Sequence, residues 1–141
     1  MEDITLYNAY YDKNTEKTLY LKTYLYGVEW QGGNIIAIKD KGIVSADKTE
    51  IFVPINATSD KEGYIKPKEY LRLSLDEAKK HFTLRSKDKI VKGIVDFEVT
   101  GEKGHTIKDL ENEYDDVITI TNIMTYDFGS FNMQHWEIVG V

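Results

Sequence analysis

The sequence lacks cysteine, contains only two prolines and has no long run of apolar residues. The absence of cysteine excludes disulfide frameworks, thiolate zinc sites and cysteine nucleophiles. The acidic start, Met1-Glu2-Asp3, is not followed by the apolar segment of a secretory signal, and no stretch is long enough to span a bilayer. We therefore expect a protein that is made in the cytoplasm and does not enter a membrane.

An excess of positive charge is also missing. The 141 residues carry 24 acidic and 18 basic side chains, a formal net charge of −6, and the two signs are interleaved along the chain. This balance favours solubility and disfavours a protein that follows a phosphate backbone, so nucleic acid is an unfavoured partner. A chain of this length is expected to form one domain, residues 1–141, around a single core.

β-Branched and aromatic residues dominate the apolar segments, which indicates a mainly β protein. We expect strands over residues 4–10, 17–30, 35–38, 43–53, 89–99, 116–126 and 133–141. Turns are predicted at residues 12–15, at Gln31-Gly32-Gly33-Asn34, at 40–42 and at 127–130. Adjacent glycines favour the second of these turns because they supply positive φ without steric cost. The polar residues 56–66 are expected to form an exposed loop.

Two short helices complete the predicted fold. Ser74 and Glu77 have the spacing of a capping box, which predicts a helix that begins there and reaches about residue 82. Thr106 precedes apolar residues at helical spacing, which predicts a second helix over residues 107–114. The predicted architecture is a single small, partly open barrel or sandwich of about seven to nine antiparallel strands with these two helices.

Motifs for catalysis or metal binding are weak. The sequence has three histidines, His81, His105 and His135. They lack the short-range partners of a zinc site. Asp12, Asn14 and Glu16 are spaced like the start of a calcium loop, but the glycine and the later glutamate of that loop are missing, so a hairpin turn is favoured. The acidic residues between 111 and 116 are typical of a solvated face. With no nucleophile elbow, phosphate-binding loop or dinucleotide fingerprint, we predict no catalytic residue, metal site or cofactor, and a protein that is not an enzyme.

Tyrosine is the residue in surplus, since six of the ten tyrosines lie within the first 26 positions. Tyrosine is enriched at protein contacts, and rings that cap the open ends of a small barrel explain the surplus equally well. The candidate interface residues are Tyr20, Tyr24, Tyr26, Trp30 and Tyr64. Four of these residues, all except Tyr64, could also stack on the bases of single-stranded nucleic acid in a β-barrel. The basic groove that such a barrel needs is not visible in the sequence, and this alternative stays open.

Residues 128–141 run from an aromatic glycine turn into an apolar strand that ends on Ile-Val-Gly-Val. We expect this strand to pair with the strand predicted over residues 116–126 and to close the fold. The candidate anchors of the strand are Phe128, Gly129, His135 and Trp136. His135 and Trp136 are expected to act in packing and in fixing the turn.

An ordered series of short motifs runs along nearly the whole chain. The motifs are Tyr7-Asn8-x-Tyr10-Tyr11-Asp12, Gly27-Val28-x-Trp30, Ala46-Asp47, Ile90-Val91-x-Gly93, Tyr114-Asp115-Asp116-Val117 and Phe128-Gly129-Ser130 with His135-Trp136. In this order they resemble an uncharacterised family of phage and prophage proteins, encoded among head and minor-capsid genes of phages that infect Gram-positive bacteria. Many members read Phe-Gly-Ser-Pro-His-Trp near the end, whereas this chain has Phe131-Asn132-Met133-Gln134 between Ser130 and His135.

The resemblance implies a non-enzymatic structural protein of the virion, made in the host cytoplasm. In size and β content the chain is also similar to head-closure proteins, which join head to tail as rings on the portal. The expected partners are portal, connector or tail proteins and further copies of the chain in a ring. In such a ring, one patch of each subunit would contact a different patch of the next subunit. The candidates for the two patches are the tyrosine-rich strand predicted over residues 17–30 and the strand predicted over residues 133–141. The 56–66 loop is expected to reach a neighbouring ring. A tail-completion or other virion assembly protein and a nucleic-acid-binding barrel are the alternatives.

Overall fold

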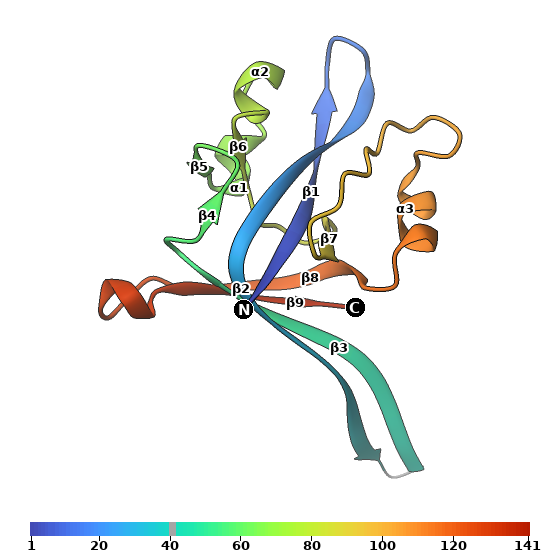
Figure 1. Ribbon diagram of the computed structural model, residues 1–141, viewed down its shortest axis with the longest axis vertical. Helices are drawn as coiled ribbons and strands as arrows, with labels where there is room; N and C mark the ends of the chain where they lie inside the picture. The colour runs from blue at the N-terminus through green and yellow to red at the C-terminus, as the bar shows by residue number, and fades with distance from the viewer. Residues whose placement is uncertain (40–41) are drawn as a thin grey trace.

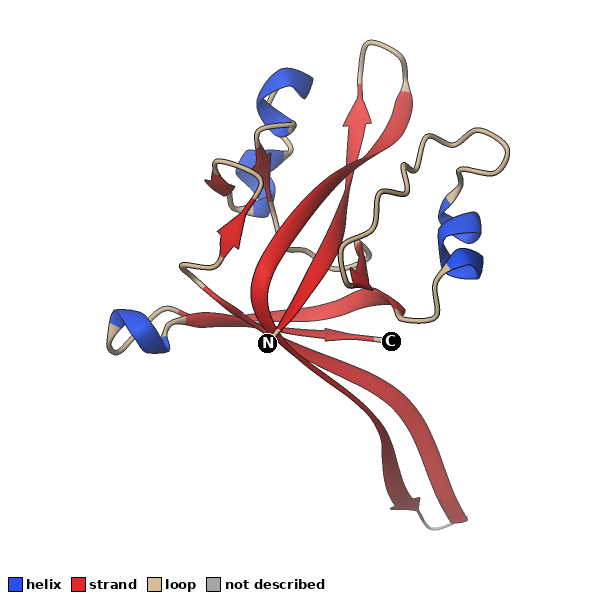
Figure 2. Cartoon of the chain, in the orientation of Figure 1, coloured by secondary structure: helices blue, strands red, loops and turns tan. Residues whose placement is uncertain are grey.

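A computed structural model of the chain describes the backbone of residues 1–39 and 42–141 (Figure 1). The strands are β1 (Glu2–Asp12), β2 (Lys17–Lys39), β3 (Gly42–Pro54), β4 (Thr58–Ser59), β5 (Gly63–Tyr64), β6 (His81–Phe82), β7 (Lys89–Lys92), β8 (Val117–Tyr126) and β9 (His135–Gly140). The helices are α1 (Pro67–Tyr70), α2 (Leu75–Ala78), α3 (Ile107–Glu113) and the 3-10 helix η1 (Phe131–Met133). The protein is therefore mainly β, as predicted (Figure 2).

Six strands enclose the main core through one series of antiparallel pairings. The order is β1–β7–β8–β9–β3–β2, and β2 also pairs with β1. β2 pairs with β1 over residues 17–28 and with β3 over residues 29–39, and β8 pairs first with β7 and then with β9. Strands that pass from one sheet to the next in this way form the corners of a small barrel or sandwich. The predicted architecture, a partly open barrel or sandwich of antiparallel strands, is confirmed.

A β-bulge at Gly27 lies where β2 changes from pairing with β1 to pairing with β3. Leu25 lies opposite Ile4 and Val28 opposite Glu2, so three steps along β2 match two along β1. Gly27 has a φ of +73°, a conformation that glycine adopts without the steric cost of a side chain. The extra residue reverses the alternation of side chains, and both Leu25 and Val28 are fully buried in the main core. An uninterrupted period of two over residues 17–30 would place Val28 on the face of Tyr24 and Tyr26, and the bulge moves it to the face of Leu25.

Three clusters of buried residues hold the fold together. The main cluster fills the barrel with aliphatic side chains such as Ile4, Leu6 and Ile138. A second cluster includes Tyr7 and lies between β1 and α3, and a third includes Tyr10 and lies between β1 and the α1–α2 segment. β1 is therefore covered on both faces, which explains why every residue from 4 to 8 is buried.

A two-stranded arm extends β2 and β3 beyond the body of the molecule (Figure 1). The last contact of β3 with β9 is the pair Thr49–Gly140. Beyond it, the pairs from Gly33–Lys48 to Lys39–Gly42 join only β2 and β3 within the described residues. We call residues 33–39 and 42–48 the β2–β3 arm.

The predicted turn at Gln31-Gly32-Gly33-Asn34 is wrong. These residues continue β2 and pair with residues 47–50 of β3. Glycine permits extended as well as turn conformations, and the partner strand determines which is used. The turn predicted at 40–42 falls on Asp40 and Lys41, which lie outside the described residues.

The strand predicted over residues 89–99 ends at Lys92. Gly93 has a φ of +90°, and the following residues are held by side chains in place of a neighbouring strand. Tyr24 donates its hydroxyl hydrogen to the Val95 carbonyl oxygen at 2.9 Å, and Tyr7 donates to the Phe97 carbonyl oxygen at 2.7 Å. Val95 and Phe97 pack on the second cluster, so the alternating pattern reflects burial against β1 and α3 without strand pairing.

The segment between residues 56 and 82 also differs from prediction. The 56–66 loop contains β4, which pairs with β2, and β5, which pairs with β6. The Ser74 hydroxyl caps α2 by accepting from the Glu77 backbone N–H, as predicted, but α2 ends at Ala78 and Phe82 belongs to β6. α1 raises the number of α-helices in the described residues from the predicted two to three. Its four residues are too few to show helical periodicity, although a proline at its start is a known signal.

Candidate functional site

A buried polar cluster joins β1 to the loop that precedes β7. Asn8 Nδ2 donates to the Thr83 carbonyl oxygen and to Asp88 Oδ2, both at 2.8 Å, and Asn8 Oδ1 accepts from the Thr83 N–H at 3.1 Å. Asp88 also accepts from the Ala9 N–H at 3.2 Å and from Arg85 Nε at 2.9 Å. Burial raises the pKa of Asp88, while the Arg85 charge and these hydrogen bonds oppose the shift. The Asn8 amide and the Asp88 carboxylate therefore make their hydrogen bonds within the cluster, which indicates a structural role.

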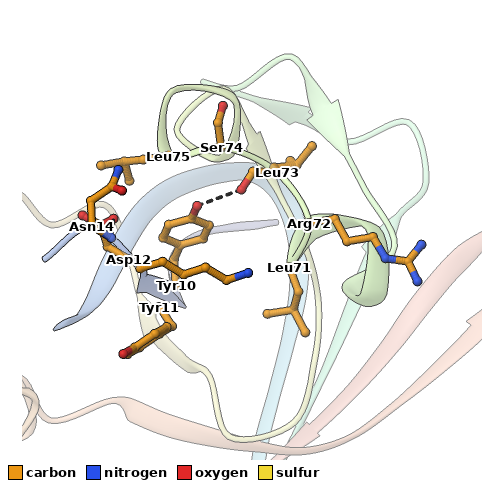
Figure 3. A pocket seen from close by; sticks show the side chains of 10 residues that line it. Tyr10, Tyr11, Asp12, Asn14, Leu71, Arg72, Leu73, Ser74 and Leu75 are labelled. Carbon is orange, nitrogen blue, oxygen red and sulfur yellow. Dashed lines mark hydrogen bonds between the residues drawn. The ribbon is translucent and has the colours of Figure 1, made fainter. Parts of the chain in front are cut away.

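A cleft of about 510 Å³ lies between the β1–β2 turn and the segment that joins α1 to α2 (Figure 3). Tyr10 donates its hydroxyl hydrogen to the Leu73 carbonyl oxygen at 2.7 Å, as the dashed line in Figure 3 shows. Asp12 accepts from the backbone N–H of Asn14 at 3.1 Å, while Arg72 points away from Tyr10. The hydrogen-bonded groups of the cleft thus hold the turn and the helical segment in place.

The predicted interface residues of β2 lie in different surroundings. Tyr20 is half-buried against the second cluster. Tyr24 is also half-buried, and its hydroxyl group donates to the Val95 carbonyl oxygen. Tyr26, next to the Gly27 bulge, is 36% exposed. The rings therefore do not share one continuous exposed face, and their role in an interface stays a prediction.

Trp30 and Tyr64 both pack on the main core. The Lys92 Nζ lies 5.9 Å from the centre of the Trp30 ring. Tyr64 contacts Trp136 with a centroid distance of 4.6 Å and Phe82 with one of 6.0 Å. These aromatic contacts attach the β5–β6 segment to the closing strand.

The closing strand β9 is held at its start by His135 and Trp136. The His135 ring stacks on Tyr126 at 5.0 Å, and its Nδ1 is hydrogen-bonded to the Met133 carbonyl oxygen at 2.8 Å. This hydrogen bond raises the pKa of His135, and Glu137, whose Oε1 lies 3.2 Å from Nε2, adds to the increase. Trp136 is buried in the main core.

The turn between β8 and β9, residues 127–134, is here called the β8–β9 tip. Gly129 has a φ of +84°, as a turn at this position requires. Phe128, one of the predicted anchors, is largely exposed, although its ring lies 5.9 Å from that of Tyr126. Phe131 and Met133 are also exposed, and neither is among the predicted anchors. Their signal in the sequence is large apolar side chains within a segment of turn residues.

The described residues were searched for a metal-binding group and for a membrane-spanning helix. Among the side chains that the structure describes, no group of three or more acidic, histidine or cysteine residues is placed to hold a metal ion. Among the same residues, no helix has the length and apolar character needed to cross a membrane.

Comparison with known proteins gives one match, to a family model. The model described as "Family of unknown function (DUF6751)" matches residues 1–141. No match was found among curated proteins or among solved structures. The description of the family assigns no activity.

Proposed function

Since the chain belongs to the family of unknown function DUF6751 over its whole length, we propose a function from its own geometry and sequence. The protein is a non-enzymatic structural protein of a phage virion, a head–tail connector that acts through contacts with other proteins. The observation that carries this proposal is the β2–β3 arm.

The arm has the properties of a segment that another protein covers. A two-stranded hairpin is only marginally stable in water by itself. Within the described residues, each strand of the arm is paired along one edge only. Residues 35–38 read Ile-Ile-Ala-Ile and residues 43–46 read Ile-Val-Ser-Ala, so seven of these eight residues are aliphatic. A partner strand added to the unpaired edge would form hydrogen bonds with the backbone of the arm. The same partner would provide apolar contacts for the aliphatic residues of the arm.

The placement in a virion is supported by the ordered motifs described above, which resemble phage proteins encoded among head and minor-capsid genes. A connector has to contact several proteins at once, and an arm that extends beyond the body provides such reach. The proposed partners are the portal or connector on one side and tail proteins on the other. No reaction, cofactor or metal is part of the proposal.

The proposal is tested by measuring the mass of the protein with the portal ring and, separately, with the tail-tube protein encoded in the same genome. In a trimmed variant, an Asn-Gly turn joins Gly32 directly to Thr49 and replaces the whole arm. The matched control replaces the β1–β2 turn, residues 13–16, with the same Asn-Gly turn. We expect the unmodified protein and the control to bind the portal ring and the trimmed variant to lose binding.

Equal portal binding by the trimmed variant would contradict the role of the arm. Failure of the unmodified protein to bind either partner would contradict the assignment as a connector. Binding to the tail-tube protein alone would identify a tail-completion protein and overturn the head–tail placement.

A further inference from the structure

The β8–β9 tip exposes three large apolar side chains within six residues. Phe128 is 71% exposed, Phe131 59% and Met133 71%. Single exposed apolar residues are common on protein surfaces, but a group of them on one turn marks a contact site. Aromatic residues and methionine are also enriched in protein interfaces.

Local hydrogen bonds hold the tip in a defined shape. The Met133 N–H donates to the Ser130 carbonyl oxygen at 2.9 Å, and Gln134 Nε2 donates to the Gly129 carbonyl oxygen at 3.3 Å. The Ile55 N–H donates to the Gln134 carbonyl oxygen at 3.1 Å, which ties the tip to the body. A partner therefore meets an ordered surface and loses little conformational entropy on binding.

The tip carries negative charge and no positive charge. Its residues, 127–134, include Asp127 and contain no lysine or arginine. The tip thus combines apolar side chains with negative charge, and a complementary surface would combine apolar and basic groups.

A groove with those properties lies beside the tip, between α1 and β8. It has a volume of about 570 Å³ and is lined by Tyr64, Lys66, Pro67, Lys68, Glu69, Arg72 and Thr125. Tyr64 and Pro67 supply apolar surface, and the three basic residues outnumber the one acidic residue. In the described part of the chain, none of these three basic side chains forms an ion pair.

We propose that the occupant of this groove is the β8–β9 tip of a second copy of the chain. Apolar contacts would cover Phe128 and Phe131, while Asp127 meets the basic side chains of the groove. This inference rests on the proposed function only in that both assign the chain a role in protein contacts. It uses surfaces separate from the β2–β3 arm, which stays free for a different partner.

The position of the groove predicts a reciprocal dimer. Thr125 lines the groove and Phe128 follows three residues later, so the groove and the tip adjoin on one molecule. When one copy inserts its tip, the groove of that copy therefore faces the tip of the other. The result is a pair of identical contacts related by a two-fold axis. This isologous arrangement is common to most dimers.

The test is sedimentation of the purified full chain over a range of concentrations. The tip variant Phe131→Asp and the groove variant Lys68→Glu with Arg72→Glu each remove both contacts of the dimer. We expect each to weaken dimerisation by at least about tenfold. A mixture of the two variants regains one intact contact, so it should dimerise more strongly than either variant alone. The control Tyr11→Asp alters an aromatic residue that is 54% exposed at the far end of β1 and should leave the dimer unchanged.

Thermal unfolding of each variant verifies that these exposed substitutions leave the fold intact. A wild-type chain that stays monomeric up to about 1 mM would overturn the inference. A dimer that the tip and groove variants leave unchanged would overturn it as well. A monomeric protein that binds the portal ring would contradict the dimer and support the proposed function. A dimeric protein that binds neither the portal ring nor the tail-tube protein would support the dimer and contradict the proposed function.

Discussion

Asn8 connects β1 to the loop before β7 through both ends of its amide group. Its side chain is fully buried and makes three hydrogen bonds, two as donor and one as acceptor. Two of these bonds satisfy the N–H and carbonyl groups of Thr83, which is itself fully buried. Buried polar groups that lose their partners carry the whole cost of desolvation, so this single residue has a large effect on stability.

Replacing Asn8 with alanine should therefore destabilise the protein by about 2–4 kcal/mol. The variant leaves the Thr83 backbone without its partners and removes one donor from Asp88. Urea unfolding followed by circular dichroism measures the change. Asn14→Ala, at an exposed turn position, is the control and should change stability by less than about 0.5 kcal/mol. A similarly small effect of Asn8→Ala would show that the cluster does not stabilise the fold.

At the scale of elements, β9 is the strand that lies between β3 and β8. It pairs with β3 on one side and with β8 on the other. Gly140, near its end, lies opposite Thr49 in β3 and Ile120 in β8. A Cβ atom at Gly140 would lie 2.9 Å from the Thr119 carbonyl oxygen, closer than normal van der Waals contact. The absence of a side chain here allows the strands to approach.

Gly140→Ala should accordingly destabilise the protein by about 1–3 kcal/mol, because backbone as well as side-chain atoms have to move. Thermal unfolding measures the effect as a lower midpoint temperature. Gly63→Ala is a suitable control, since Gly63 also lies in a strand and a Cβ there meets no atom within 4 Å. Equal midpoints for the two variants would mean that the close approach at β9 carries no energetic weight.

The whole molecule consists of a packed body and the β2–β3 arm. The arm pairings beyond Gly32–Thr49 involve no third strand among the described residues. We therefore expect the body to fold without the arm, and the proposed contact with the portal ring to depend on the arm.

The arm-trimmed variant tests this independence through its stability. We expect a single cooperative unfolding transition with a free energy within about 1 kcal/mol of the wild-type value, since the described pairings of the arm involve no third strand. Denaturant unfolding followed by tryptophan fluorescence reports on Trp136 in the main core and on Trp30, which packs against it. A loss of cooperativity would contradict the division into body and arm.

Local patterns in the sequence predicted several elements correctly. The strands around residues 4–10 and 43–53, the helix after Thr106 and the closing hairpin all appear in the structure. These elements carry signals within a few residues, such as alternation or a cap. Trp136 also lies in the main core of the protein.

Other features depend on contacts between distant residues. The Gly27 bulge, the continuation of β2 through Gly32 and Gly33, and the non-strand path of Val95 are examples. Glycine permits several backbone conformations, and an alternating pattern reports burial without identifying the partner. The candidate groove also combines α1 with β8, which are about 55 residues apart in sequence.

The sequence by itself determined the mainly β class and the acidic, cysteine-free character, because composition and local periodicity encode these properties directly. Only the tertiary structure decided where β2 changes sheets, how far the arm extends and which apolar side chains stay exposed. The physical reason is that exposure and register depend on which distant segments pair. Phe131 and Trp136 are both large aromatic residues five positions apart, yet one lies on an exposed tip and the other in the core.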